Sequence, residues 1–117
     1  MNFLSNMFGP ALPALSALEL SEKLKNIKHP LVLDVRQPEE YQGGHIAGAK
    51  LVPLGELRQH MQELPKDKEI ICVCASGNRS GTATKMLIEA GYNAINMNGG
   101  MSTWQHAQLP VKKGSAA

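Results

Sequence analysis

Cysteine is scarce in this sequence: the chain of 117 residues has only two, Cys72 and Cys74. Two cysteines do not make the disulfide framework of a small secreted domain. If their segment is a strand, their Cα atoms lie about 6.6 Å apart, near the upper limit for a disulfide, so a bridge between them is not expected. Reduced thiols are typical of the cytoplasm, where we expect this protein to act.

Clusters of metal ligands and of like charges are also missing. The four histidines are scattered and the two cysteines are too close together for zinc spacing, so no metal site is expected. The formal net charge is +2, and no basic run carries interleaved aromatic residues. Nucleic acid is therefore not an expected partner, whereas a small anionic substrate suits a slightly basic chain.

No segment is long and apolar enough to be expected to cross a membrane. The first residues, MNFLSNMFGPALPALSALEL, are rich in Leu, Phe, Met and Ala, but Pro10 and Pro13 interrupt them and no Lys or Arg precedes the apolar part. These features argue against a signal peptide. We expect residues 1–18 to form an apolar extension that packs on the domain or on a partner; the alternative is a targeting segment.

The rest of the chain alternates between helical and strand patterns. Its length fits one domain, and 43% hydrophobic with 19% charged residues indicates a globular chain that can hold a core. Leu20, Leu24 and Ile27 share one face of a predicted helix over residues 19–28, and Trp104 opens a last short helix. Strands alternating with helices predict an α/β domain with a mostly parallel sheet. Strands are predicted at 31–35, 49–53, 69–74 and 92–97, and further helices at 38–42, 54–64 and after residue 80.

The pattern turns from strand to helix at Cys74. The small residues and central glycine of the loop let backbone N–H groups turn inward as an anion-binding nest, and the following helix points its positive end at the same space. Arg79 adds a permanent cation. Such surroundings lower the pKa of a cysteine from about 8.5 to about 3.5–7.5, so we predict that Cys74 is a nucleophile. The predicted binding loop for an anionic substrate is Ala75, Ser76, Gly77, Asn78, Arg79 and Ser80.

Each cysteine has a second interpretation. Free cysteines are often small, inert core residues, and Cys74 could be one at an ordinary strand-to-helix connection. Cys72 lies inside the apolar run, where a structural role is favoured. The alternative makes Cys72 a resolving thiol that accepts sulfur or oxidation from Cys74.

At these residues the sequence resembles the rhodanese-like domain, the single-domain sulfurtransferase family. The family's loop pattern C-x-x-G-x-R matches Cys74, Gly77 and Arg79. An upstream signature, DVRQPEEYQGGHIAGA, and a downstream one, NMNGGMSTW, follow in the expected order. On this resemblance we expect a rhodanese-like domain over residues 19–112 and a flexible tail over residues 113–117.

The resemblance implies a five-stranded parallel sheet flanked by helices. It also implies that Cys74 takes a sulfane sulfur from thiosulfate or a persulfide donor, becomes a persulfide, and passes the sulfur to a thiol or cyanide. A protein sulfur carrier is a further expected partner. No cofactor is needed, because the persulfide carries the sulfur.

Two other functions remain open. The related cell-cycle phosphatases and arsenate reductases use a C-x5-R loop, whereas only four residues separate Cys74 from Arg79 here, which favours sulfur transfer. The chain could also be a sulfur-carrier or interaction module that docks through its apolar N-terminal segment.

Asp34 and Arg36 end the first predicted strand, and they could stand near Cys74 if the two strands are neighbours. The Asp34 carboxylate could then accept hydrogen bonds from the loop and hold its shape. The alternative is structural, with Arg36 paired to Glu39 or Glu40 to anchor a turn.

Overall fold

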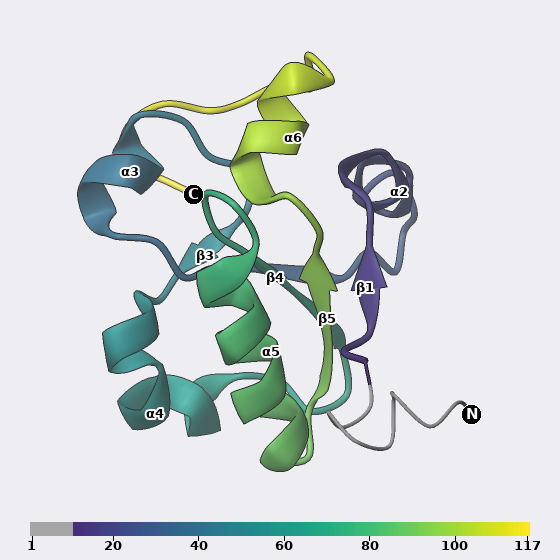
Figure 1. Cartoon of the computed structure of the whole chain (residues 1–117), viewed down its shortest axis with the longest axis vertical. Coiled ribbons are helices and arrows are strands. Elements are labelled where there is room, and N and C mark those ends of the chain that lie inside the picture. The colour runs from purple at the N-terminus through teal and green to yellow at the C-terminus, as the bar shows by residue number, and fades with distance from the viewer. Residues whose placement is uncertain (1–10) are drawn as a thin grey trace.

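A parallel β-sheet with helices on both faces forms the centre of the molecule in the computed structural model, which describes residues 11–117 (Figure 1). The order of the strands is β1-β5-β4-β2-β3, and every neighbouring pair is parallel. The predicted α/β class with a five-stranded parallel sheet is confirmed. The strands are β1 (Ala14–Leu15), β2 (Leu31–Asp34), β3 (Lys50–Leu51), β4 (Glu69–Val73) and β5 (Asn93–Met97).

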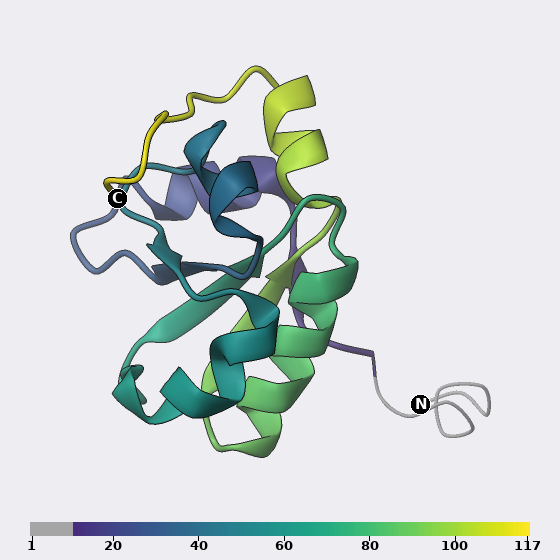
Figure 2. The ribbon, with the colours of Figure 1, turned by 90° about the vertical axis from the view of Figure 1, so that its left-hand side faces the viewer.

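The helices form two layers, one on each face of the sheet (Figure 2). One layer contains α2 (Ala17–Lys23), α3 (Pro38–Gln42) and α6 (Gly100–His106), and the other contains α4 (Leu57–His60) and α5 (Asn78–Glu89). Short 3-10 turns at Leu54–Glu56 and Met61–Glu63 flank α4. Among residues 11–117, no helix combines the length and the apolar character needed to cross a membrane.

Strand β4 lies in the middle of the sheet and is covered on both faces, which explains its continuous apolar run. Successive side chains of a strand point to opposite faces. Ile71 and Val73 accordingly pack with α2 and α6, whereas Ile70 and Cys72 pack with α4 and α5. The same alternation places Cys74, just after the strand, on the α5 face.

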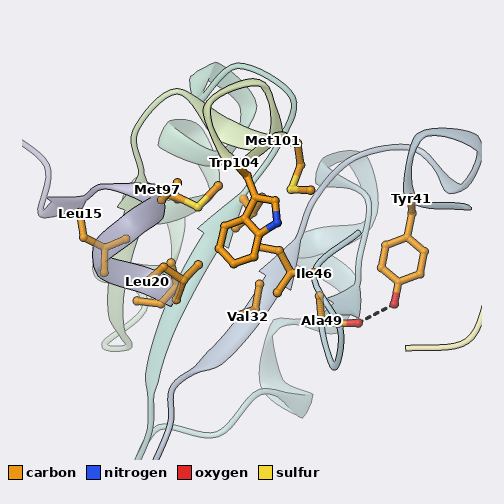
Figure 3. Packing of buried hydrophobic residues seen from close by; sticks show 12 residues of the cluster. Leu15, Leu20, Val32, Tyr41, Ile46, Ala49, Met97, Met101 and Trp104 are labelled. Atoms are coloured by element: carbon orange, nitrogen blue, oxygen red, sulfur yellow. Dashed lines mark hydrogen bonds between the residues drawn. The ribbon is translucent and has the colours of Figure 1, made fainter. Parts of the chain in front are cut away.

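Trp104 lies at the centre of the core on the α2 and α6 face (Figure 3). Its indole ring is surrounded by Leu20, Ile46 and Met97, and its Nε1–H donates to the carbonyl of Pro110 at 2.9 Å. The indole is therefore buried with its polar group satisfied, as an aromatic core residue requires. This packing joins α6 to α2 and makes Trp104 a core residue.

The structure differs from the sequence expectations at both ends of α2. Strand β1 and the first turn of α2 lie before residue 19 and contribute the buried Leu15 to the core, so the fold begins inside the predicted extension. Residues 1–10 of that extension lie outside the described residues. The helix ends at Lys23 and not at residue 28, and Ile27 is 99% exposed. Residues 24–28 form turns that lead to β2, which begins directly after Pro30.

The last helix also begins earlier than predicted, at Gly100 and not at Trp104. Gly99 precedes it with a left-handed backbone (φ 76°), which glycine adopts without steric cost. Gly99 and Gly100 carry no apolar signal and are typical of turns, so the pattern does not indicate a helix that begins at Gly100, although Met101 is buried.

We expect Leu20→Ala to lower the free energy of unfolding by about 2–5 kcal/mol, because Leu20 is fully buried beside Trp104 and its removal leaves a cavity. The matched control is Leu18→Ala on the same helix, at a side chain that is 61% exposed, with an expected change of about 0.5 kcal/mol or less. Urea denaturation followed by circular dichroism measures both. Equal losses would contradict the assignment of the core face of α2.

Candidate active site

The loop that joins β4 to α5 carries the predicted nucleophile and lies between α3 and α6 (Figure 1). It starts at the carboxyl end of β4, at the edge where parallel α/β sheets form their sites. Glycine at position 77 has a left-handed backbone (φ 101°) and caps α5, which begins at Asn78. The predicted hand-over from strand to helix is confirmed.

The sulfur of Cys74 is the acceptor at the centre of this loop. The backbone N–H of Gly77 donates to Sγ at 3.0 Å, and the hydroxyl of Ser80 donates at 3.3 Å. Burial of the side chain acts to raise the pKa of Cys74. The Ser80 hydroxyl and the backbone N–H groups of Ser80, Gly77 and Ser76 outweigh it, so the pKa lies below its ordinary value. The loop thus stabilises a thiolate, as the sequence predicts.

The predicted loop residues reach the sulfur in different ways. Ser80 is buried and uses its hydroxyl, whereas the side chain of Ser76 is exposed and only its backbone N–H contributes. The carbonyl of Ala75 is bound by α6, and that of Asn78 accepts from Thr82 Oγ1 at 3.5 Å within α5. Backbone geometry therefore matters more at these positions than side-chain chemistry.

Helix α6 holds the loop through its first N–H groups. The N–H of Met101 donates to the carbonyl of Cys74 at 2.8 Å, and the N–H of Ser102 donates to the carbonyl of Ala75 at 3.0 Å. Gly100 makes this approach feasible, because a Cβ at position 100 would lie 2.3 Å from the carbonyl oxygen of Cys74. The NGG motif of the downstream signature thus supports the candidate site and is more than a turn.

Asn96 of β5 supports the loop from the sheet. Its Nδ2 donates to the carbonyl of Gly77 at 3.3 Å. A Cβ on Gly77 would lie 3.1 Å from the backbone nitrogen of Gly99, so glycine is required there by space as well as by its backbone angle. No sequence pattern points to Asn96, because alternation within a strand indicates only which residues are buried.

Arg79 makes a contact that the sequence did not reveal. Its Nη1 and Nη2 donate to the two carboxylate oxygens of Glu40 on α3, at 2.7 and 2.8 Å. The pair is about one-third exposed. Hydrogen bonds from Arg79 lower the pKa of Glu40 to about 2, and Glu40 raises the pKa of Arg79. The cation predicted to face the anionic substrate is thus already paired with a carboxylate 39 residues away in sequence.

Asp34 and Arg36 form a buried ion pair with each other. Arg36 Nε and Nη2 donate to the two carboxylate oxygens of Asp34, at 2.9 and 2.8 Å, and Nη2 also donates to the carbonyl of Gly44 at 2.9 Å. Neither the expected contact of Asp34 with the loop nor an Arg36 pair with Glu39 or Glu40 is present. The pair fastens the end of β2 to the chain after α3, while β2 itself lies beside β4.

Cys72 lies on the same face of β4 as Cys74, but in different surroundings. Its side chain is fully buried, and burial raises the pKa of Cys72 to about 11. Both cysteines are free thiols. This supports the structural interpretation of Cys72. Within residues 11–117, no three His, Cys, Asp or Glu side chains come together as a metal site would require.

Fold and site together define an α/β protein that holds a cysteine in a loop whose N–H groups donate to its sulfur, at the end of a central parallel strand. The sequence profile of the family described as "Rhodanese-like domain" matches residues 16–107. The chain belongs to the rhodanese-like domain family, and the predicted resemblance is confirmed.

The relatives cover most of the chain. A protein of Allochromatium vinosum named sulfurtransferase is 34% identical over 79% of this chain and 87% of its own length. Thiosulfate sulfurtransferase GlpE of Pseudoalteromonas translucida is 34% identical over 77% of this chain and 83% of its own length. The crystal structure of a rhodanese-related protein from Thermoplasma volcanium matches with a TM-score of 0.81 at 36% identity, over 86% of this chain and 97% of that one. The sequence thus lies within a family of sulfurtransferases.

We expect Ser80→Ala to move the pKa of Cys74 upward, because it removes a hydroxyl that donates to the thiolate. The rate of alkylation by iodoacetamide follows the thiolate, so its midpoint shifts to higher pH. Ser76→Ala is the matched control, since it keeps the backbone N–H and removes only an exposed hydroxyl. Cys72→Ala in every variant leaves a single thiol to follow. Equal midpoints in the two serine variants would contradict the role of Ser80.

We expect Gly100→Ala to be more destabilising than Gly48→Ala. Both glycines have positive φ, so both substitutions add about 1–2 kcal/mol of backbone strain. A Cβ at position 48 meets nothing within 4 Å, whereas one at position 100 collides with the backbone at Cys74 and Ala75, which adds about 1–3 kcal/mol. Chemical denaturation measures the difference. A Gly48 variant as unstable as the Gly100 variant would contradict the close approach of α6 to the loop.

Proposed function

We propose that the protein is a cytoplasmic sulfurtransferase that carries sulfur as a persulfide on Cys74. The observation that carries the proposal is the set of N–H and hydroxyl donors on Sγ, which lowers the pKa of Cys74 and stabilises its thiolate. A thiolate so placed is both a nucleophile and a good acceptor of an electron-poor sulfur. The GlpE relative, named as a thiosulfate sulfurtransferase, supports thiosulfate as one donor.

The reaction proceeds in two displacements. The Cys74 thiolate attacks the outer sulfur of thiosulfate, the sulfur–sulfur bond of the donor breaks, and sulfite leaves with the electron pair. The new Cys74 persulfide anion occupies the N–H cup, which spreads its charge over the same donors. Cyanide or a thiolate then attacks the outer sulfur, leaves as thiocyanate or as a persulfide, and returns the Cys74 thiolate. The protein itself supplies every group needed, so no cofactor enters.

The short loop favours this reaction over phosphate or arsenate chemistry. Four residues lie between Cys74 and Arg79, and the N–H of Gly77 within this stretch and the hydroxyl of Ser80 just beyond it converge on one sulfur atom. A compact persulfide fits such a ring better than a tetrahedral oxyanion seated over the sulfur. A low-molecular-weight persulfide or a protein sulfur carrier could serve as donor or acceptor by the same two steps.

We expect the wild-type protein to gain the mass of one sulfur atom when it is incubated with thiosulfate, because the thiolate of Cys74 forms a stable persulfide. Cys74→Ala should gain none. Cys72→Ala should gain the sulfur as the wild type does, since the pKa of Cys72 is raised and its side chain is buried. Intact-protein mass spectrometry with and without a later addition of cyanide measures loading and release.

Two results would overturn the proposal. One is a wild-type protein that takes up no sulfur from thiosulfate or from a small persulfide. The other is a Cys74→Ala variant that still takes up sulfur. Turnover of an aryl phosphate or of arsenate that depends on Cys74, without sulfur transfer, would favour the phosphatase or reductase class instead.

A further inference from the structure

The ion pair between Arg79 and Glu40 changes the charge at the candidate site. Arg79 is the one cation in the loop, and both of its terminal nitrogens donate to Glu40. The two side chains are 36% and 35% exposed, so water and solutes reach the pair. An anionic donor that approaches Cys74 therefore meets a guanidinium whose charge is already balanced by a carboxylate of the same chain.

Helix α3 holds Glu40 independently of Arg79. Proline at position 38 starts the helix, and the backbone N–H of Gln37 donates to Glu40 Oε1 at 3.0 Å. This hydrogen bond fixes the carboxylate at the first turn of the helix, where the helix dipole also favours a negative charge. Since hydrogen bonds lower the pKa of Glu40 to about 2, the carboxylate stays charged at neutral pH. Only a competing anion, and not a proton, can free Arg79 there.

The pair is built as an exchangeable contact rather than as a core element. The other guanidinium pair, Arg36 with Asp34, is nearly completely buried, with 5% and 1% of the side chains exposed. A bidentate pair with this exposure contributes little to stability and is screened by salt. Arginine binds sulfonate-like oxygens with the same planar set of donors that it offers to a carboxylate.

We propose that Glu40 is a specificity-determining residue: it competes with the donor for Arg79, so the protein discriminates against donors in proportion to their negative charge. The proposal rests on the proposed sulfur transfer to Cys74. A dianionic donor such as thiosulfate has to displace the carboxylate or tolerate its repulsion. A donor with less charge, such as the persulfide of a small thiol, is repelled less by the Glu40 carboxylate. Such a donor is therefore favoured relative to thiosulfate.

The test compares Glu40→Gln with Glu39→Gln. Both substitutions remove one negative charge from the first turns of α3, but Glu39 is exposed and makes no ion pair. Three reagents differ in charge: thiosulfate carries two negative charges, methanethiosulfonate carries one, and iodoacetamide is neutral. The measurements are kcat/KM for the two donors with cyanide as acceptor, and the alkylation rate for iodoacetamide.

We expect Glu40→Gln to raise kcat/KM for thiosulfate about fivefold, the gain that loss of a partly exposed competing ion pair would give. Coulomb energy is proportional to the charge of the donor, so the gain should fall to about twofold for methanethiosulfonate. The alkylation rate should not change. Glu39→Gln should leave all three values near those of the wild type.

Two outcomes would contradict the proposed competition between Glu40 and the donor for Arg79. If Glu40 merely holds Arg79 in place for the donor, Glu40→Gln lowers kcat/KM for thiosulfate. If Glu40→Gln only makes the thiolate more reactive, kcat/KM for both donors and the alkylation rate increase by the same factor. Both outcomes are distinct from failure of the proposed function, in which the wild type itself transfers no sulfur from either donor.

Discussion

The close contact between α6 and the backbone at Cys74 is the constraint on which the candidate site depends. Two N–H groups of α6 bind the carbonyls of Cys74 and Ala75, and this contact is feasible only because position 100 has no Cβ. With its carbonyls held from outside, the loop turns its own N–H groups inward toward the sulfur. The same helix carries Trp104 into the core, so the packing of the fold and the shape of the site are coupled.

The charges around the loop are divided between two arginines with different surroundings. Arg36 is buried with Asp34 and ties the end of β2 to the chain beyond α3. Arg79 is about one-third exposed, and water reaches its ion pair with Glu40. A buried pair of this kind costs too much to break, whereas the exposed one exchanges partners readily. The groups that lower the pKa of Cys74 are the Ser80 hydroxyl and backbone N–H groups, and these dipoles cannot be neutralised by a change of ion-pair partner.

Much of the fold could be predicted because periodicity and chain order constrain it. The continuous apolar run of β4 required cover on both faces, and alternation with helices required a parallel sheet. The predictions fail where a local pattern conflicts with the path of the chain between two elements, or where an element is very short. Ile27 fits a helical face but lies in the turn that leads to β2, and strand β1 is too short to show alternation.

The sequence by itself determined where the cysteine loop lies and that a helix follows it, because the apolar strand, the glycine and the helical pattern are all local features of the chain. It also separated Cys72 in the strand from Cys74 at its end. Only the tertiary structure decided what surrounds them: α6 on the loop carbonyls, Asn96 beneath Gly77, and Glu40 on Arg79. These contacts join residues up to 39 positions apart, and their geometry follows from how the helices pack on the sheet, which no local pattern encodes.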